Sequence, residues 1–168
     1  MRKELTHLDD SGRARMVDVG AKPVTERQAV AQGRVHMRRE TLALAQAGDS
    51  KKGSIRAAAV FAGVMAAKRT PDLIPLCHQI ALSSVAIDIA ADEAESALVV
   101  TARAKTRSQT GVEMEALTAV SLACLTIYDM LKASDRAMTI ENIRLLEKRG
   151  GASGEHRHDS SAFHPKKG

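Results

Sequence analysis

The sequence predicts an α+β fold in which helices cover one face of a mainly antiparallel sheet. Periodicity indicates the order helix, strand, strand, helix, strand, with further strand-like segments in front, and this order packs naturally in two layers. The chain has 168 residues, 44% of them hydrophobic, which suffices for one domain with a real core. Only 2% are aromatic, so the core must consist of Ala, Val, Ile, Leu and Met, which suits close packing of helices on a sheet.

The first elements have weak patterns. Residues 16–20 alternate apolar and polar side chains and predict a short strand, and residues 24–37 continue in the same style with an interruption at Gly33. Residues 38–47 predict a short helix that ends at Gly48.

A second helix is predicted over residues 51–69. Asp49 and Ser50 are good N-cap residues for it, and Pro71 terminates it. The segment is rich in Ala and Gly, so its backbone can approach a neighbouring element closely.

The remaining elements have clearer patterns. Two strands are predicted around residues 85–89 and 98–104, separated by an acidic turn. The longest helix follows over residues 112–133, and a last strand is predicted over residues 138–147. We expect one domain over residues 1–150.

Residues 151–168 are predicted to be a flexible tail, because Gly, Ser, His and Lys leave almost nothing to bury. Three histidines in the tail could bind a metal in principle, but a disordered end that contains histidines is far commoner. They are His156, His158 and His164.

Charge and cysteine usage narrow the class of protein. The net charge is +5 and is dispersed along the chain, which fits a phosphorylated small molecule at least as well as a polyanion. The scarcity of aromatic residues argues against single-stranded nucleic-acid binding. Two cysteines cannot form a disulfide framework, and we see neither a signal peptide nor an apolar run of membrane-spanning length. We therefore expect a cytoplasmic protein that binds neither nucleic acid nor membranes.

The longest helix has two apolar stripes, which predicts two buried faces. One runs through Leu117, Val120, Cys124, Ile127 and Leu131, and the other through Leu122, Leu125, Asp129 and Lys132. The sheet can cover only one of these faces, and in a chain this short we expect another subunit to cover the second.

Asp129 and Lys132 are candidates for proton transfer. An acid and a base three residues apart are usually a solvated surface pair. Their alignment with Leu122 and Leu125 instead favours a partly buried pair with perturbed pKa values.

Glu113 lies in the first apolar stripe, where an unpaired carboxylate is unexpected, although a favourable interaction with the helix dipole is the simpler explanation. It lies sixteen residues from Asp129, about 24 Å along one helix. If both serve one small ligand, the site must be shared between subunits.

The loop over residues 68–78 suits an anion. Lys68 and Arg69 can bind phosphate, and His78 can transfer protons or bind an anionic oxygen. Cys77 beside His78 does not predict a metal site, because no second pair stands at ligand spacing. Residues 48–54 only faintly resemble a phosphate loop, although Lys51 or Lys52 near a helix N-terminus can still meet a phosphate.

Several long runs resemble the molybdenum cofactor biosynthesis protein C family. The resemblance is collinear over about residues 4–155 and includes Ala-Ala-Lys-Arg-Thr-Pro-Asp-Leu-Ile-Pro-Leu-Cys-His and Thr-Gly-Val-Glu-Met-Glu-Ala-Leu-Thr-Ala. The matching runs are residues 5–8, 16–19, 66–78, 110–119, 125–130 and 150–154.

The resemblance implies a ferredoxin-like α+β fold and a homohexamer built from dimers, with the active site at a subunit interface. It implies a lyase that converts the cyclic dihydroguanosine triphosphate to cyclic pyranopterin monophosphate and diphosphate, with no metal or organic cofactor. By position, the catalytic residues fall on Asp129, Lys132 and Lys52. Substrate-binding residues fall on Leu76, Cys77, His78, Met114 and Glu115, with Glu113, Lys68, Arg69, Lys22 and Arg27 in the same pocket.

The chemistry assigns expected roles to these groups. Lys52 and Lys132 would be the general acid and base, with Asp129 holding Lys132 charged or accepting a proton. Lys68, Arg69 and His78 would neutralise the triphosphate and the departing diphosphate. Two other functions compete with this one: a nucleotide-sensing protein without turnover, and an RNA-binding module of the same architecture.

Overall fold

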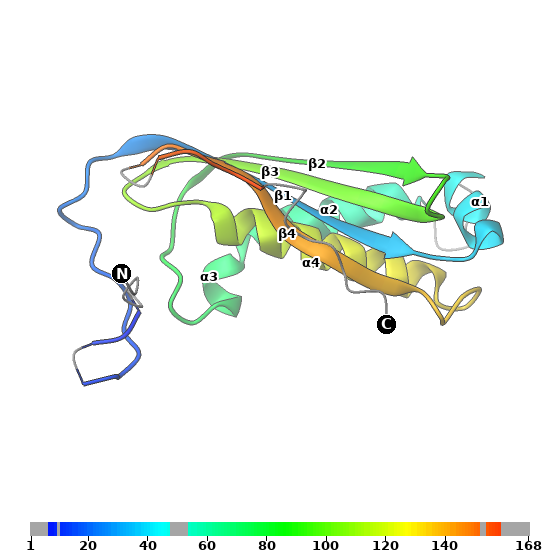
Figure 1. The fold of residues 1–168 in the computed structure, drawn as a ribbon, viewed down its shortest axis with the longest axis horizontal. Coiled ribbons are helices and arrows are strands. Elements are labelled where there is room, and N and C mark those ends of the chain that lie inside the picture. Colours follow the sequence, from blue (N-terminus) through cyan, green and yellow to red (C-terminus); the bar gives the residue numbers. More distant parts are fainter. Residues whose placement is uncertain (1–6, 10, 48–53, 152–153, 159–168) are drawn as a thin grey trace.

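The computed structural model describes residues 7–9, 11–47, 54–151 and 154–158, and shows one five-stranded sheet with two long helices on one face (Figure 1). The strands lie in the order β2-β3-β1-β4-β5, and every neighbouring pair is antiparallel. The strands are β1 (Thr25–His36), β2 (Leu82–Asp92), β3 (Ala97–Ser108), β4 (Thr139–Arg149) and β5 (His156–Arg157). The helices are α1 (Arg39–Ala47), α2 (Ile55–Lys68), α3 (Thr70–Leu73) and α4 (Glu113–Leu131).

This topology confirms the predicted α+β fold of ferredoxin-like type. The chain order β1-α2-β2-β3-α4-β4, together with the sheet order β2-β3-β1-β4, places both long helices on the same face. The short helix α1 lies beside the β2–β3 hairpin, where Gln46 donates a hydrogen bond to Glu93 at 2.7 Å.

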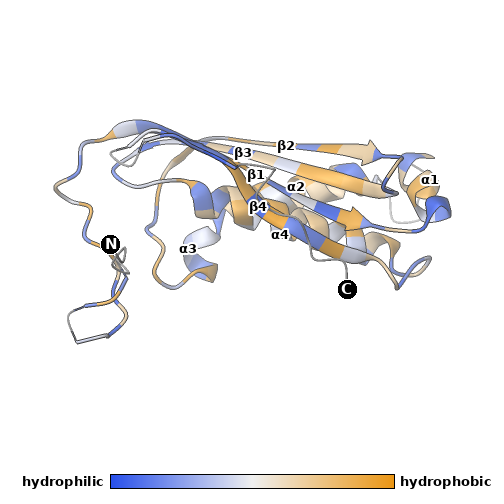
Figure 2. Cartoon of the chain, viewed as in Figure 1, coloured by the Kyte–Doolittle hydropathy of each residue, from blue (hydrophilic) through white to orange (hydrophobic). Residues whose placement is uncertain are grey.

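Small residues allow the two long helices to pack closely. A Cβ added to Gly63 of α2 would lie 2.9 Å from the carbonyl oxygen of Ala119 in α4 and would collide with Ile87 of β2. The core consists largely of Ala, Val, Ile and Leu side chains, as the aromatic-poor composition predicts. Figure 2 shows hydrophobic residues concentrated along β3 and α4, and hydrophilic residues at the beginning of β1.

Two predicted elements differ in the structure. Residues 16–20 form no strand, and the carbonyls of Val17 and Gly20 are bonded to the side chains of His78 and Gln109. The second described helix begins at Ile55, and its N-cap is Ser54, whose side chain accepts a hydrogen bond from the Ala57 N–H at 3.2 Å. The predicted caps Asp49 and Ser50 lie outside the described residues.

The first apolar stripe of α4 packs as predicted, whereas the second faces away from the sheet. Val120, Cys124 and Ile127 are fully buried, but Leu125 is 52% exposed. The Asp129–Lys132 pair on this outer face is therefore exposed within one chain rather than partly buried.

By length and composition, α4 would also suit a membrane span. Half of that span is buried within the domain, which is the behaviour of a core helix.

In the segment predicted as a tail, β5 pairs with β4 through Glu147 opposite Arg157 and Lys148 opposite His156. The free edge of β4 supplies the backbone groups for this pairing.

Candidate active site

A cavity of about 840 Å³ opens at the end of the sheet where β1 begins and where β3 and β4 end. Antiparallel pairing brings these three strand ends together, and α4 begins beside them. The N-terminal segment and the loop after α3 complete the walls. The lining residues are His7, Ala14, Lys22, Arg27, Ile74, Pro75, Leu76, Cys77, His78, Gln109, Thr110, Gly111, Glu113, Met114 and Lys148.

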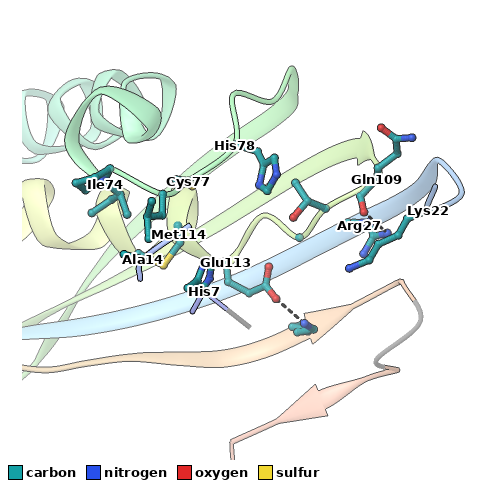
Figure 3. Close-up of a pocket in the computed structure, with 15 residues that line it drawn as sticks. His7, Ala14, Lys22, Arg27, Ile74, Cys77, His78, Gln109, Glu113 and Met114 are labelled. Atoms are coloured by element: carbon teal, nitrogen blue, oxygen red, sulfur yellow. Dashed lines mark hydrogen bonds and ion pairs between the residues drawn. The ribbon is translucent and has the colours of Figure 1, made fainter. Parts of the chain in front are cut away.

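The two ends of this pocket differ in chemistry. Figure 3 shows Ile74, Cys77 and Met114 gathered at one end, and Lys22 and Arg27 at the other. The pocket therefore offers an apolar surface for a ring system and cationic groups for an anion.

Two backbone carbonyls fix the side chain of Arg27. Its Nε donates to the Ser108 carbonyl at 3.0 Å, and its Nη2 donates to the Gln109 carbonyl at 3.1 Å. The residue is only 8% exposed, and no carboxylate in the described part of the chain pairs with it. A buried guanidinium that has only carbonyl partners keeps its full charge for an anionic ligand.

His78 ties the N-terminal segment to the pocket. Its Nε2 lies 2.7 Å from the Val17 carbonyl oxygen, and because a carbonyl only accepts, Nε2 carries the hydrogen. Gln109 makes a second link by donating to the Gly20 carbonyl at 2.9 Å. These two bonds place residues 17–20 along the rim of the pocket.

Glu113 is paired, which accounts for a carboxylate in an apolar stripe. Lys148 Nζ lies 2.5 Å from Glu113 Oε1, and this ion pair is the dashed line that begins at Glu113 in Figure 3. Both side chains are about three-quarters buried. The pair joins the first residue of α4 to the end of β4 across the cavity. Lys148 was not predicted as a site residue, because it lies thirty-five residues from Glu113 in the chain and only the fold brings the two together.

Glu115 lies behind the pocket wall rather than in it. The carboxylate is 1% exposed, and Cys77 Sγ contacts its Oε1 at 3.9 Å, while Oε2 has no partner among the described residues. Burial raises the pKa of Glu115, and the nearby charge of Glu113 adds to the rise.

The two cysteines should differ in reactivity. Burial raises the pKa of the Cys77 thiol, the Glu115 carboxylate adds to the rise, and burial raises the pKa of Cys124 to about 12. We expect iodoacetamide to label Cys77 slowly and Cys124 not at all in the folded protein, since the thiolate is the nucleophile. Mass spectrometry across pH 7 to 10 measures both rates.

Glu115→Gln removes one cause of the raised Cys77 pKa, so labelling in that variant should begin at lower pH. The variant Cys77→Ser is the control for site assignment. Rapid labelling of both cysteines, or an unchanged pH midpoint in Glu115→Gln, would contradict this account of the pocket wall.

The structure brings together seven of the predicted site residues and leaves others apart. The seven that line the pocket are Lys22, Arg27, Leu76, Cys77, His78, Glu113 and Met114. Lys68 and Arg69 are exposed at the end of α2 and do not line it. Lys52, like its neighbour Lys51, lies outside the described residues.

The Asp129–Lys132 pair lies at the opposite end of α4 from the pocket. Lys132 Nζ contacts Asp129 Oδ1 at 2.6 Å, and the two side chains are 53% and 62% exposed. The sixteen residues from Glu113 to Asp129 correspond to about 24 Å along the helix. Within one chain, the pair is too distant to act on a ligand in the pocket.

Sequence reasoning missed several lining residues. His7, Thr110 and Gly111 fall in runs that resemble the family, but no role was assigned to them. Gln109 lies just outside such a run, and its side chain donates a hydrogen bond to the N-terminal segment. Across the described ranges, no group of three or more His, Cys, Asp and Glu side chains is arranged to hold a metal ion.

Comparison with known proteins finds relatives over nearly the whole chain. Residues 16–151 match the MoaC family. A cyclic pyranopterin monophosphate synthase of Thermomicrobium roseum is 57% identical over 162 residues, which is 96% of this chain and 98% of that protein. Proteins of the same name from Roseiflexus castenholzii and Cereibacter sphaeroides are each 60% identical, over 90% and 89% of this chain and 96% and 94% of theirs. The chain therefore belongs to the MoaC family.

Proposed function

We propose that the chain acts as a cyclic pyranopterin monophosphate synthase, a phosphorus–oxygen lyase of molybdenum cofactor biosynthesis. Similarity at about 60% identity to synthases of this name, over nearly the whole chain, supports this function. The pocket is the observation that places the proposed function in the structure. It has an apolar surface at one end and, at the other, a buried arginine that no carboxylate of the described residues neutralises.

The substrate is (8S)-3′,8-cyclo-7,8-dihydroguanosine 5′-triphosphate. In our proposal its triphosphate lies toward Lys22, Arg27 and His78, and its fused rings lie against Leu76 and Met114. Cationic groups at the phosphate end stabilise the charge that develops on the departing diphosphate. The Glu113–Lys148 pair lies between the two ends and fixes the start of α4.

The reaction requires both proton transfers and a displacement at phosphorus. Opening the imidazole ring and building the pterin move protons, for which Lys52 and Lys132 are the proposed acid and base. Closing the cyclic phosphate forms a new oxygen bond to the α-phosphorus and breaks its bond to the oxygen that bridges to the β-phosphate, which releases diphosphate. Asp129 orients Lys132 at 2.6 Å.

We further propose that each active site is shared between two chains of a homohexamer. The pair Asp129 and Lys132 lies about 24 Å along α4 from the pocket of its own chain, so it must serve the pocket of another. The outer helical layer carries exposed apolar side chains that a second copy would cover, with Phe61 69% and Met65 55% exposed in α2. We place the enzyme in the cytoplasm.

Turnover tests the function directly. The purified chain, supplied with the cyclic triphosphate, should release cyclic pyranopterin monophosphate and diphosphate in equal amounts, measured by chromatography and a coupled diphosphate assay. A well-folded oligomer that binds the substrate without releasing either product would contradict the proposal and favour a nucleotide-sensing protein.

A further inference from the structure

The turn after β4 packs against the pocket arginine. Gly150 and Gly151 follow the last residue of β4 with φ values of +88° and +84°. The Gly154 N–H then donates to the Gly151 carbonyl at 3.3 Å, and the chain enters β5. This turn lies beside the start of β1, where the side chain of Arg27 enters the cavity.

Gly151 leaves the space that the guanidinium occupies. A Cβ at this position would lie 2.9 Å from Arg27 Cζ and 3.3 Å from Nη2, and it would collide with Nη1. Real Cβ atoms do not approach other heavy atoms so closely, so a side chain at position 151 must displace the guanidinium. The displacement would break the two bonds from Arg27 to the carbonyls of Ser108 and Gln109.

We propose that Gly151 is a positioning residue for the anion-binding end of the pocket. Because it has no Cβ, the guanidinium of Arg27 lies between the turn and two backbone carbonyls, and its charge faces the cavity. The inference rests on the proposed function, in which Arg27 binds the triphosphate. It assigns to the turn a role beyond reversing the chain direction into β5, since a turn needs only the positive φ and not the empty space.

The neighbouring glycine provides a matched control. Gly154 has φ +72°, so alanine there suffers the same kind of left-handed strain, but a Cβ at 154 has no described heavy atom within 4 Å. We expect Gly151→Ala to raise KM about tenfold or more, because a misplaced binding group can cost up to about a hundredfold. Gly154→Ala should change KM less than about twofold and lower Tm by a few degrees at most.

A double-mutant cycle of Gly151→Ala and Arg27→Ala decides whether Gly151 positions the guanidinium or only stabilises the fold. Without the guanidinium, Gly151→Ala should add nothing to KM, and its effect on Tm should fall to that of Gly154→Ala. Calorimetric titration with diphosphate, used as a phosphate probe, should show the same pattern even if the chain proves to have no turnover.

The proposal would be overturned if Gly151→Ala raised KM by the same factor with and without the Arg27 side chain. Equal KM values for Gly151→Ala and Gly154→Ala would also overturn it. If Gly151→Ala alone does not fold, the combined variant Gly151→Ala/Arg27→Ala still decides, because removal of the guanidinium should restore folding. If Arg27→Ala folds but the combined variant does not, the proposal is wrong.

Discussion

Replacing Lys132 by alanine should lower kcat by about 10²- to 10⁴-fold, the range that a positioned acid or base contributes. The side chain is 53% exposed and its described partner is Asp129 in the same chain, so its loss should leave folding nearly unchanged. The melting temperature should therefore stay close to that of the wild type. Steady-state product formation and differential scanning fluorimetry measure the two quantities.

Lys105 is a suitable control for loss of positive charge. It lies on β3, outside the pocket and far along the chain from the Asp129–Lys132 pair, and Lys105→Ala removes the same charge. We expect this variant to keep wild-type turnover within about twofold, since surface substitutions are usually near neutral. Undiminished turnover in Lys132→Ala would remove this lysine from the mechanism.

Periodicity predicted most of the fold because the later strands and the longest helix have a clearly apolar face. The stripe through Val120, Cys124 and Ile127 identified the side of α4 that packs on the sheet. The small residues of α2 likewise indicated a close helix contact, which Gly63 makes against Ala119. Residues 16–20 show the limit, because alternation predicts a strand but cannot tell whether a sheet edge is free to pair with it.

The pocket was harder to predict than the fold. Its walls come from five segments far apart in the chain, and only tertiary packing brings Lys148 within 2.5 Å of Glu113. The resemblance to the family supplied seven of the fifteen lining residues by position. It included the run 150–154 but gave no role to Gly151, whose importance lies in the space that a missing side chain leaves for Arg27.

Mixed oligomers test whether the site is shared. Lys132→Ala keeps an intact pocket, and Arg27→Ala keeps an intact Asp129–Lys132 pair, so each variant alone should keep little activity at substrate concentrations near the wild-type KM. If a pocket works with the lysine of another chain, randomly mixed oligomers should regain about 25% of wild-type activity, since half the pockets are intact and half of those meet an intact lysine. The two variants are co-expressed with different tags, purified through both, and assayed for turnover.

A second mixture serves as the control for complementation. Asp129→Asn and Lys132→Ala alter the same end of α4, so every site in their mixed oligomers receives a defective pair and no activity should return. Complementation in the first mixture but not in the second requires the pocket and the pair to come from different chains. If the first mixture shows only the summed activity of its two variants, pocket and pair do not act together across an interface. The catalytic acid and base must then lie closer to Glu113 and Lys148 within one chain.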